Sequence, residues 1–268
     1  SNIGGSLNKV FINEYDASLP ITDIAGLNGY ENFQFKLNLS NEKSISYYYE
    51  NDQTRVDKIY TLKDDDFIIQ SEIIISNKSE MSKQIDIGIG GYMVDISSLD
   101  ISGKNGSDQK NSASDKSLLE YAVYVENDIY RKSSAFKFSP KDKKEGYGKV
   151  YWSGFRDRYF CALVKPLYES TGYSIMPIGE NKLHVSMGTK RITLEPGSSV
   201  NFNSVIYVGP ERMDILKRYT MGFEKIKRYY RFALLDGVAK IISSMMEFIY
   251  KFIPNWGVCI VLISCIIY

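Results

Sequence analysis

The sequence predicts a mainly β protein, a large antiparallel β-sandwich followed by C-terminal helices. From about residue 5 to residue 208, apolar runs of strand length alternate with turn residues, and no helical period separates them. At residue 209 the pattern changes to residues that start helices, and from residue 232 apolar side chains recur at helical spacing. A chain of 268 residues can bury a core, as one large β domain or as two smaller ones.

Charge and cysteine content argue against several classes of protein. The 33 basic and 32 acidic residues nearly balance, whereas nucleic-acid binding is driven by a basic excess. Cys161, Cys259 and Cys265 are spaced too widely for a zinc or CxxC pattern. We expect Cys161 in the core and the other two in an apolar tail. The chain opens on a strand-like segment, so we expect either a cytoplasmic protein or a membrane anchor upstream of Ser1.

The clearest strands lie in KIYTLKDDDFIIQSEIIISNKS. Residues 59–62 and 67–76 are predicted strands, and Lys63-Asp64-Asp65-Asp66 between them is a predicted turn. The segment 84–96 alternates in the same way. Residues 149–166 predict two strands around 154–158, and residues 181–209 predict three strands with a turn at 195–197.

Two segments lack this alternation and are predicted to be loops. Residues 102–117 contain Ala113 as their one apolar residue and are predicted to form a mobile loop, and residues 141–149 to form a second exposed loop. The predicted core residues of the segment YWSGFRDRYF are Trp152, Tyr159 and Phe160.

A helix is predicted to start at Gly209-Pro210. Proline is favoured at the first helical position, and Glu211 follows in the first turn. The predicted helix runs to about Gly222. A basic connector then extends to residue 231.

Residues 232–253 predict an amphipathic helix with one apolar face. Polar residues keep the same period on the opposite face. Two interpretations compete: a surface helix packed on the domain, or a helix lying in a membrane interface. For the second, the predicted membrane contacts are Leu234, Val238, Ile241, Ile242, Met245, Phe248, Ile249, Phe252 and Trp256.

The segment after this helix favours the membrane interpretation. Pro254 ends the helix, Trp256 is an aromatic residue of the kind found at interfaces, and the chain then stays apolar to Tyr268 except for Ser264. A spanning helix needs about 20 apolar residues, and this run offers about a dozen. A buried C-terminal strand or helix stays open as an alternative.

Several segments, in this order, resemble the YidC-type membrane protein insertases. These segments are GGSLNKVFINEY (4–15), YTLKDDDFIIQSEIIISNKS (60–79), YWSGFRDRYFCALVKP (151–166), LEPGSSVNFNSVIYVGPERMDILKRY (194–219) and NWGVCIVLISCIIY (255–268). The amphipathic helix resembles the interfacial helix of that family. Each piece is weak alone, and the order and spacing make the resemblance specific.

The resemblance implies four parts of the chain. Residues 1–208 would be a periplasmic β-supersandwich related to galactose-mutarotase-like folds, and residues 209–231 a closing helix and basic connector. Residues 232–253 would be the interfacial helix, and residues 255–268 the start of a transmembrane helix. The chain would then be a fragment, with one membrane helix before Ser1 and the rest of the spans after Tyr268.

The resemblance also implies a function. The protein would insert and fold inner-membrane proteins, alone or beside the Sec translocon, with nascent chains and the lipid bilayer as partners and with no cofactor or chemical step. It would lie in the bacterial inner membrane, with residues 1–253 on the periplasmic side. A basic residue of the family's groove falls on Tyr268 here, so that residue is not carried over.

Other functions are weaker on the sequence. Mutarotase chemistry needs an acid and a base, usually His and Glu, and the one histidine, His184, alternates with strand residues. Asp64-Asp65-Asp66 lacks the spacing of a calcium loop. No nucleophile elbow, phosphate loop or metal cluster is evident. A carbohydrate-binding sandwich, or a periplasmic adaptor anchored to the membrane, is the alternative.

Overall fold

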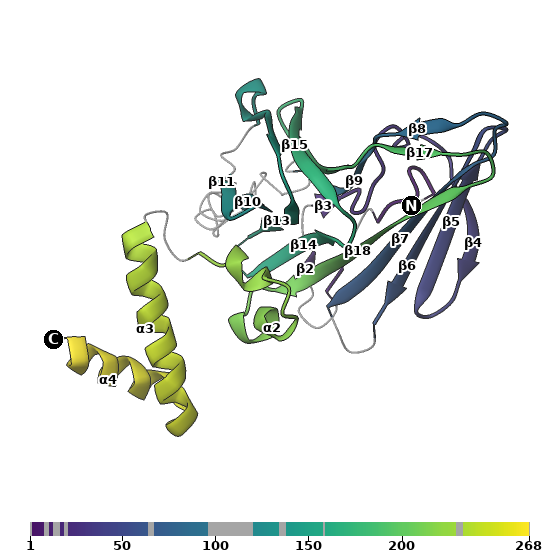
Figure 1. The fold of residues 1–268 in the computed structure, drawn as a ribbon. Coiled ribbons are helices and arrows are strands. Elements are labelled where there is room, and N and C mark those ends of the chain that lie inside the picture. Colours follow the sequence, from purple (N-terminus) through teal and green to yellow (C-terminus); the bar gives the residue numbers. More distant parts are fainter. Residues whose placement is uncertain are drawn as a thin grey trace, which may run out of the picture. The chain divides into compact units, whose positions relative to one another are not determined.

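The computed structural model describes residues 2–7, 11–12, 17–18, 21–63, 67–95, 120–133, 138–157, 159–228 and 233–267. The chain divides into two compact units, which are described separately: Ser1–Phe223, called the sandwich unit, and Glu224–Tyr268, called the helical unit. The strands labelled in Figure 1 belong to the sandwich unit, as does α2, whereas α3 and α4 belong to the helical unit.

The larger sheet of the sandwich unit has nine strands, all paired antiparallel, in the order β11-β10-β13-β14-β18-β7-β6-β5-β4. Their bounds are β4 (Lys36–Ser40), β5 (Ser44–Glu50), β6 (Thr54–Leu62), β7 (Ile68–Asn77), β10 (Glu120–Val125), β11 (Asp128–Ser133), β13 (Val150–Arg156), β14 (Phe160–Pro166) and β18 (Ser199–Pro210).

A five-stranded antiparallel sheet, in the order β12-β15-β16-β9-β3, forms the second layer. It consists of β3 (Ile21–Thr22), β9 (Gly88–Asp95), β12 (Lys144–Tyr147), β15 (Ser170–Ile178) and β16 (Lys182–Thr189). Two short ribbons pair β1 (Phe11–Ile12) with β2 (Ala17–Ser18), and β8 (Lys83–Ile85) with β17 (Ile192–Leu194).

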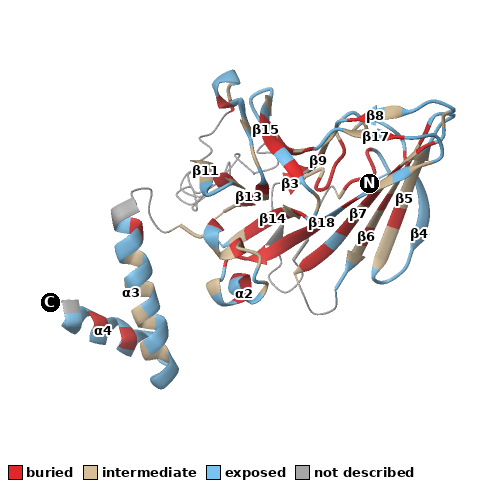
Figure 2. Cartoon of the chain, viewed as in Figure 1, coloured by how far each residue is buried: buried red, intermediate tan, exposed pale blue. Residues whose placement is uncertain are grey.

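The main core contains residues of both sheets. Val164 and Ile206 of the nine-stranded sheet belong to the same buried cluster as Tyr92 and Val185 of the five-stranded sheet. Along β6, buried residues alternate with partly exposed ones, as expected for a strand with one covered face. Figure 2 shows buried residues on β14, β18 and β7 of the larger sheet and on β15 of the smaller one. The hydroxyl of Tyr92 donates to the carbonyl of Gly154 on β13, which satisfies this polar group within the core.

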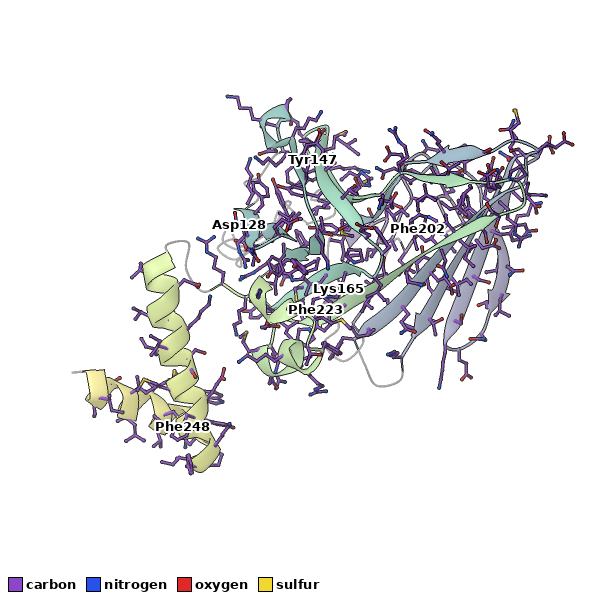
Figure 3. The ribbon with its side chains drawn as sticks, viewed as in Figure 1. Asp128, Tyr147, Lys165, Phe202, Phe223 and Phe248 are labelled. Carbon is purple, nitrogen blue, oxygen red and sulfur yellow. The ribbon has the colours of Figure 1, made fainter. Side chains whose placement is uncertain are left out.

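The opposite face of the nine-stranded sheet packs locally against α2 (Met213–Arg218) and against Phe223, the first residue of the 3-10 helix η4 (Phe223–Ile226). Tyr207 follows Ile206 on β18 and therefore points to this other face, where its ring lies 6.0 Å from that of Phe223. Figure 3 labels Phe223 beside α2. Trp152 donates from its indole nitrogen to the carbonyl of Gly222 at 3.0 Å. This second cluster holds the chain against the sheet as it leaves the sandwich.

Most strand predictions are confirmed. The predicted strands at 59–62 and 67–76 are β6 and β7, and the segment 84–96 contains β8 and β9. The three strands of 181–209 are β16, β17 and β18. The predicted turn at 195–197 is confirmed by a positive φ of 71° at Gly197 and by the amide of Ser198, which donates to the carbonyl of Glu195. Cys161 and Trp152 are buried as predicted.

The predicted helix start at Gly209-Pro210 is wrong. Both residues still belong to β18, where they pair with Cys161 and Phe160 of β14. The glycine is needed by the sheet, because a Cβ there would lie 2.7 Å from the ring of Phe67. Pro210 is the last residue of β18, and beyond it the amide of Glu211 donates to the carbonyl of Tyr159 at 2.7 Å. The helix α2 begins at Met213 and ends at Arg218 rather than near residue 222.

The prediction that Tyr159 is a core residue is also wrong, because its side chain is 64% exposed. The strand β13 continues to Arg156, and the reversal begins at Asp157, whose carboxylate accepts from the amides of Tyr159 and Phe160 at 2.7 Å each. Tyr159 therefore lies in the turn. Phe160 is half-buried and packs against the main core.

The segment 141–149 is not simply a loop. It contains the end of the 3-10 helix η3 (Pro140–Asp142) and the strand β12, which pairs with β15 at the edge of the five-stranded sheet. Edge strands often carry charged residues, so β12 lacks the apolar alternation by which a strand is predicted from sequence. Residues 64–66 of the predicted turn at 63–66, and the predicted loop at 102–117, lie outside the described residues.

The helical unit contains α3 (Ala233–Phe252) and α4 (Trp256–Ile267). The predicted helix at 232–253 is confirmed to within one residue at each end. Residues 256–267 of the apolar segment are helical as well, so the alternative of a buried C-terminal strand does not hold for them.

Candidate membrane-interface site

Helix α3 carries the ordinary signals of an amphipathic helix. Asp236 lies in its first turn and Lys251 in its last, so both charges complement the helix dipole. Lys240 forms an ion pair with Asp236 at 2.7 Å, four residues apart on the polar face. The helix ends at Phe252 because Pro254 has no amide hydrogen and disfavours the helical conformation of Ile253.

A short elbow joins α3 to α4. The side-chain oxygen of Asn255 accepts from the amides of Gly257 at 3.0 Å and Val258 at 3.3 Å, which caps the start of α4. The rings of Trp256 and Tyr250 are stacked, with centroids 4.3 Å apart and an interplanar angle of 16°. The cap and the ring pair together fix the direction in which α4 leaves α3.

The predicted membrane contacts, which lie on α3 and at the start of α4, divide into two groups. Val238, Ile241, Phe248, Phe252 and Trp256 are exposed, and Phe248 and Ile241 are exposed by 61% and 63%. Figure 3 labels Phe248 toward the end of α3 that joins α4.

The second group is partly covered. Ile242, Met245 and Ile249 are half-buried, and α4 packs against α3 within the helical unit. Leu234 lies in α3, but its side chain is outside the described part of the chain. The apolar face is therefore real, and its contact with a membrane stays a prediction.

Apart from Trp256, the exposed apolar residues of α4 are not among the predicted membrane contacts. This helix buries Cys259 and Ile263, and its other apolar side chains from Val258 to Ile266 are exposed. They are Val258, Ile260, Val261, Leu262 and Ile266. A helix that is apolar on every side is normally buried in protein or in lipid. The unbroken apolar run was the signal that could have identified these residues individually.

The single hydroxyl in α4 is satisfied within the helix. Ser264 donates to the carbonyl of Ile260 at 2.8 Å, one turn earlier. The hydroxyl hydrogen of Ser264 is therefore not available to bind water at this part of the helix. Within the described residues, no helix has both the length and the hydropathy that a membrane crossing requires.

Buried polar contacts anchor the chain at the place where it leaves the nine-stranded sheet. Arg156 of β13 pairs with Glu211 at 2.9 Å, and both side chains are largely buried. The hydroxyl of Tyr207 donates to the carbonyl of Pro210 at 2.7 Å. With the indole of Trp152 bonded to Gly222, these contacts fix residues 210–223 on the sandwich unit.

The N-terminal segment is held by a different buried group. Lys58 of β6 donates from Nζ to the carbonyl of Gly4 at 2.6 Å, and the hydroxyl of Tyr60 donates to the carbonyl of Gly5 at 2.8 Å. Burial lowers the pKa of Lys58 to about 8, while the carboxylates of Asp23 and Glu31 oppose that shift. This lysine is a structural donor.

The sandwich surface offers little catalytic chemistry. Among the described residues, no three His, Cys, Asp or Glu side chains gather to hold a metal ion. His184 is half-exposed on β16 and lies in register with Met93 and Met176, so no acid faces it from those positions. A shallow pocket of about 260 Å³ lies over β12, β15, β16 and β9 beside Tyr147, which Figure 3 labels.

Solved structures share the general architecture at low similarity. A galactose mutarotase related enzyme from Lactobacillus acidophilus is 11% identical, covering 78% of this chain and 81% of its own, with a TM-score of 0.46. An alpha-galactosidase from Geobacillus stearothermophilus is 11% identical, covering 79% of this chain and 31% of its own, also with a TM-score of 0.46. Likeness at this level carries no argument about ligand or chemistry.

Curated relatives are closer in sequence. The membrane protein insertase YidC of Pseudoalteromonas atlantica is 26% identical over 227 residues, which are 83% of this chain and 40% of the relative. The protein of the same name from Syntrophus aciditrophicus is 24% identical over 216 residues, 80% of this chain and 36% of its own length. The chain thus spans well under half the length of these relatives. The model of the YidC periplasmic domain matches residues 29–238, from the first turns of the sandwich into α3, and the chain therefore belongs to the YidC periplasmic domain family.

Proposed function

We propose that this chain is the periplasmic part of a membrane protein insertase in the bacterial inner membrane. The longer protein would insert and fold inner-membrane proteins, alone or beside the Sec translocon, and nascent apolar segments would be its substrates. The match of the YidC periplasmic domain model to residues 29–238 carries the proposal. Insertion belongs to the whole protein, of which this chain covers the part described above.

The helical unit is assigned the contact with the bilayer. In this proposal α3 lies along the interface with Ile241, Phe248 and Phe252 in the acyl region, and its Lys240 and Glu247 face water. Trp256 takes the interfacial position that indole rings favour. The exposed apolar side chains of α4 support the assignment of this helix as the start of a transmembrane segment, because contact with lipid removes their apolar surface from water.

The proposal assigns no chemical step and no cofactor to the chain. The driving force for insertion is the transfer of apolar side chains from water into the bilayer, which needs no nucleophile or metal. The sandwich would act as a rigid body that sets where the helical unit begins. The buried contacts of Trp152, Arg156 and Glu211 support that role, since they fix residues 210–223 to the sheet.

The function is tested in bacterial cells depleted of their own insertase. The complete reading frame that contains this chain is expressed, and insertion of a small inner-membrane protein is followed by protease protection from the periplasmic side. We expect insertion to be restored, and the empty vector to restore none. Failure to restore insertion, at a membrane abundance equal to that of the cells' own insertase, would overturn the proposal.

A further inference from the structure

Positive charge is concentrated where the sandwich unit meets the helical unit in sequence. Residues 211–231 contain seven Lys or Arg and three Asp or Glu, a net charge of +4. The whole chain has a net charge of +1, so the other residues, with 26 basic and 29 acidic side chains, carry −3. The basic segment therefore differs in sign from the rest of the protein.

Helix α2 presents part of this charge on its exposed side. Ile215 and Leu216 are buried, and this fixes the helix against the sheet. The charge of Arg212 is balanced by Asp214, with which it pairs at 2.7 Å. Lys217 and Arg218, in the last turn of α2, are exposed and adjacent. They form a two-residue basic surface, called here the α2 basic pair.

We propose that the α2 basic pair binds the headgroups of anionic phospholipids, a step that rests on the proposed interface position of α3. Lysine and arginine are the side chains that bind phosphate groups, arginine in a bidentate fork and lysine as a point charge. Juxtamembrane basic residues are attracted to anionic bilayers, within about a Debye length of the surface.

The length of the connector allows the α2 basic pair to reach the same lipid surface that α3 would contact. Phe223 is the last residue of the sandwich unit, and α3 begins at Ala233, so the chain between them spans at most about 35 Å. A bilayer that holds α3 is thus within the reach of the α2 basic pair. Once α3 is bound to the bilayer, the connector tethers the α2 basic pair to the same surface, so its binding to headgroups is effectively intramolecular. Two weak electrostatic contacts can then contribute measurably to the affinity.

The test uses the 268-residue chain and flotation with vesicles of phosphatidylcholine, with or without phosphatidylglycerol. The variant K217Q/R218Q removes the α2 basic pair. We expect its affinity for vesicles with phosphatidylglycerol to fall roughly 30-fold, and its affinity for pure phosphatidylcholine to stay unchanged. High salt should remove the same advantage from the wild type.

Two variants control for charge and for folding. K190Q/R191Q neutralises an adjacent Lys-Arg pair that is 67% exposed, between β16 and β17, and Figure 1 shows that α2 lies far from this turn. It removes the same net charge and should bind as the wild type does. K217R/R218K keeps both charges and should also bind normally.

The outcomes separate this inference from the proposed function. Failure of the wild type to bind phosphatidylcholine vesicles would count against the interface role of α3. Equal binding of K217Q/R218Q and K190Q/R191Q to phosphatidylglycerol vesicles would overturn this inference alone. The α2 basic pair would then be left for an acidic protein surface.

Discussion

Two exposed side chains of α3 should decide how tightly the chain binds a neutral bilayer. The variant I241N/F248N replaces them with asparagine and leaves the net charge unchanged. Full burial of an isoleucine or phenylalanine contributes about 1.5–3 kcal/mol. These two side chains are 63% and 61% exposed, so lipid would cover a little more than half of each. Their removal should therefore weaken binding by about 2–4 kcal/mol, or roughly 30- to 700-fold.

The assay is flotation with phosphatidylcholine vesicles, in which electrostatic attraction is minimal. K240N/E247N is the matched control, since it places two asparagines at the same seven-residue spacing on the polar face, also without a change in net charge. Circular dichroism verifies that both variants keep their helices. The reasoning is refuted if I241N/F248N floats as the wild type does, or if the control loses binding to the same degree.

Three further predictions concern the buried contacts. Lys58 has its ordinary pKa of 10.5 in the unfolded chain and a pKa of about 8 in the folded chain, so the unfolded chain binds more protons between these pH values. The free energy of unfolding should therefore rise with pH over this range, by roughly 3 kcal/mol. Urea denaturation midpoints measured at increasing pH should show this rise in the wild type and not in Lys58→Met. Glu211→Gln should lower the free energy of unfolding by about 3–5 kcal/mol, because the charge of Arg156 stays buried without its partner; chemical denaturation measures this. Asn255→Ala should destabilise the start of α4 by about 1 kcal/mol, seen as faster amide exchange of Val258 in micelles.

Each of these has a contrary outcome. A pH dependence that is the same in Lys58→Met and the wild type would assign it to other groups. A Glu211→Gln protein as stable as the wild type would mean that the guanidinium finds water after relaxation. Unchanged exchange at Val258 would show that the elbow is held by the ring pair of Tyr250 and Trp256 alone.

Local periodicity made the strands and the two C-terminal helices predictable. The alternation in 67–76 and the helical spacing in 232–253 each place the apolar side chains on one face of the element. Such a pattern can be read from neighbouring residues alone. The end of β18 was not predictable in the same way. Gly209-Pro210 has the composition of a helix start, and its pairing with β14 depends on residues about 50 positions earlier in the chain.

The candidate site was predicted in part for a similar reason. A helical wheel of α3 gives its apolar face, but it does not show that α4 packs on one edge of that face and leaves Ile242, Met245 and Ile249 half-buried. Nor does it show that Tyr159 lies in a turn, which follows from the carboxylate of Asp157 accepting two amides. Tertiary contacts of this kind are absent from any local pattern.

The internal hydrogen bond of Ser264 limits what α4 can recognise. Between helices in lipid, hydroxyl and amide side chains act as adhesive groups, and small residues permit close approach. Since the hydroxyl hydrogen of Ser264 is already donated to Ile260, this residue offers a neighbour only its oxygen as an acceptor. Beyond Trp256, a helix that packs on α4 in a membrane would therefore be selected mainly by shape, at small residues such as Gly257 and Cys265.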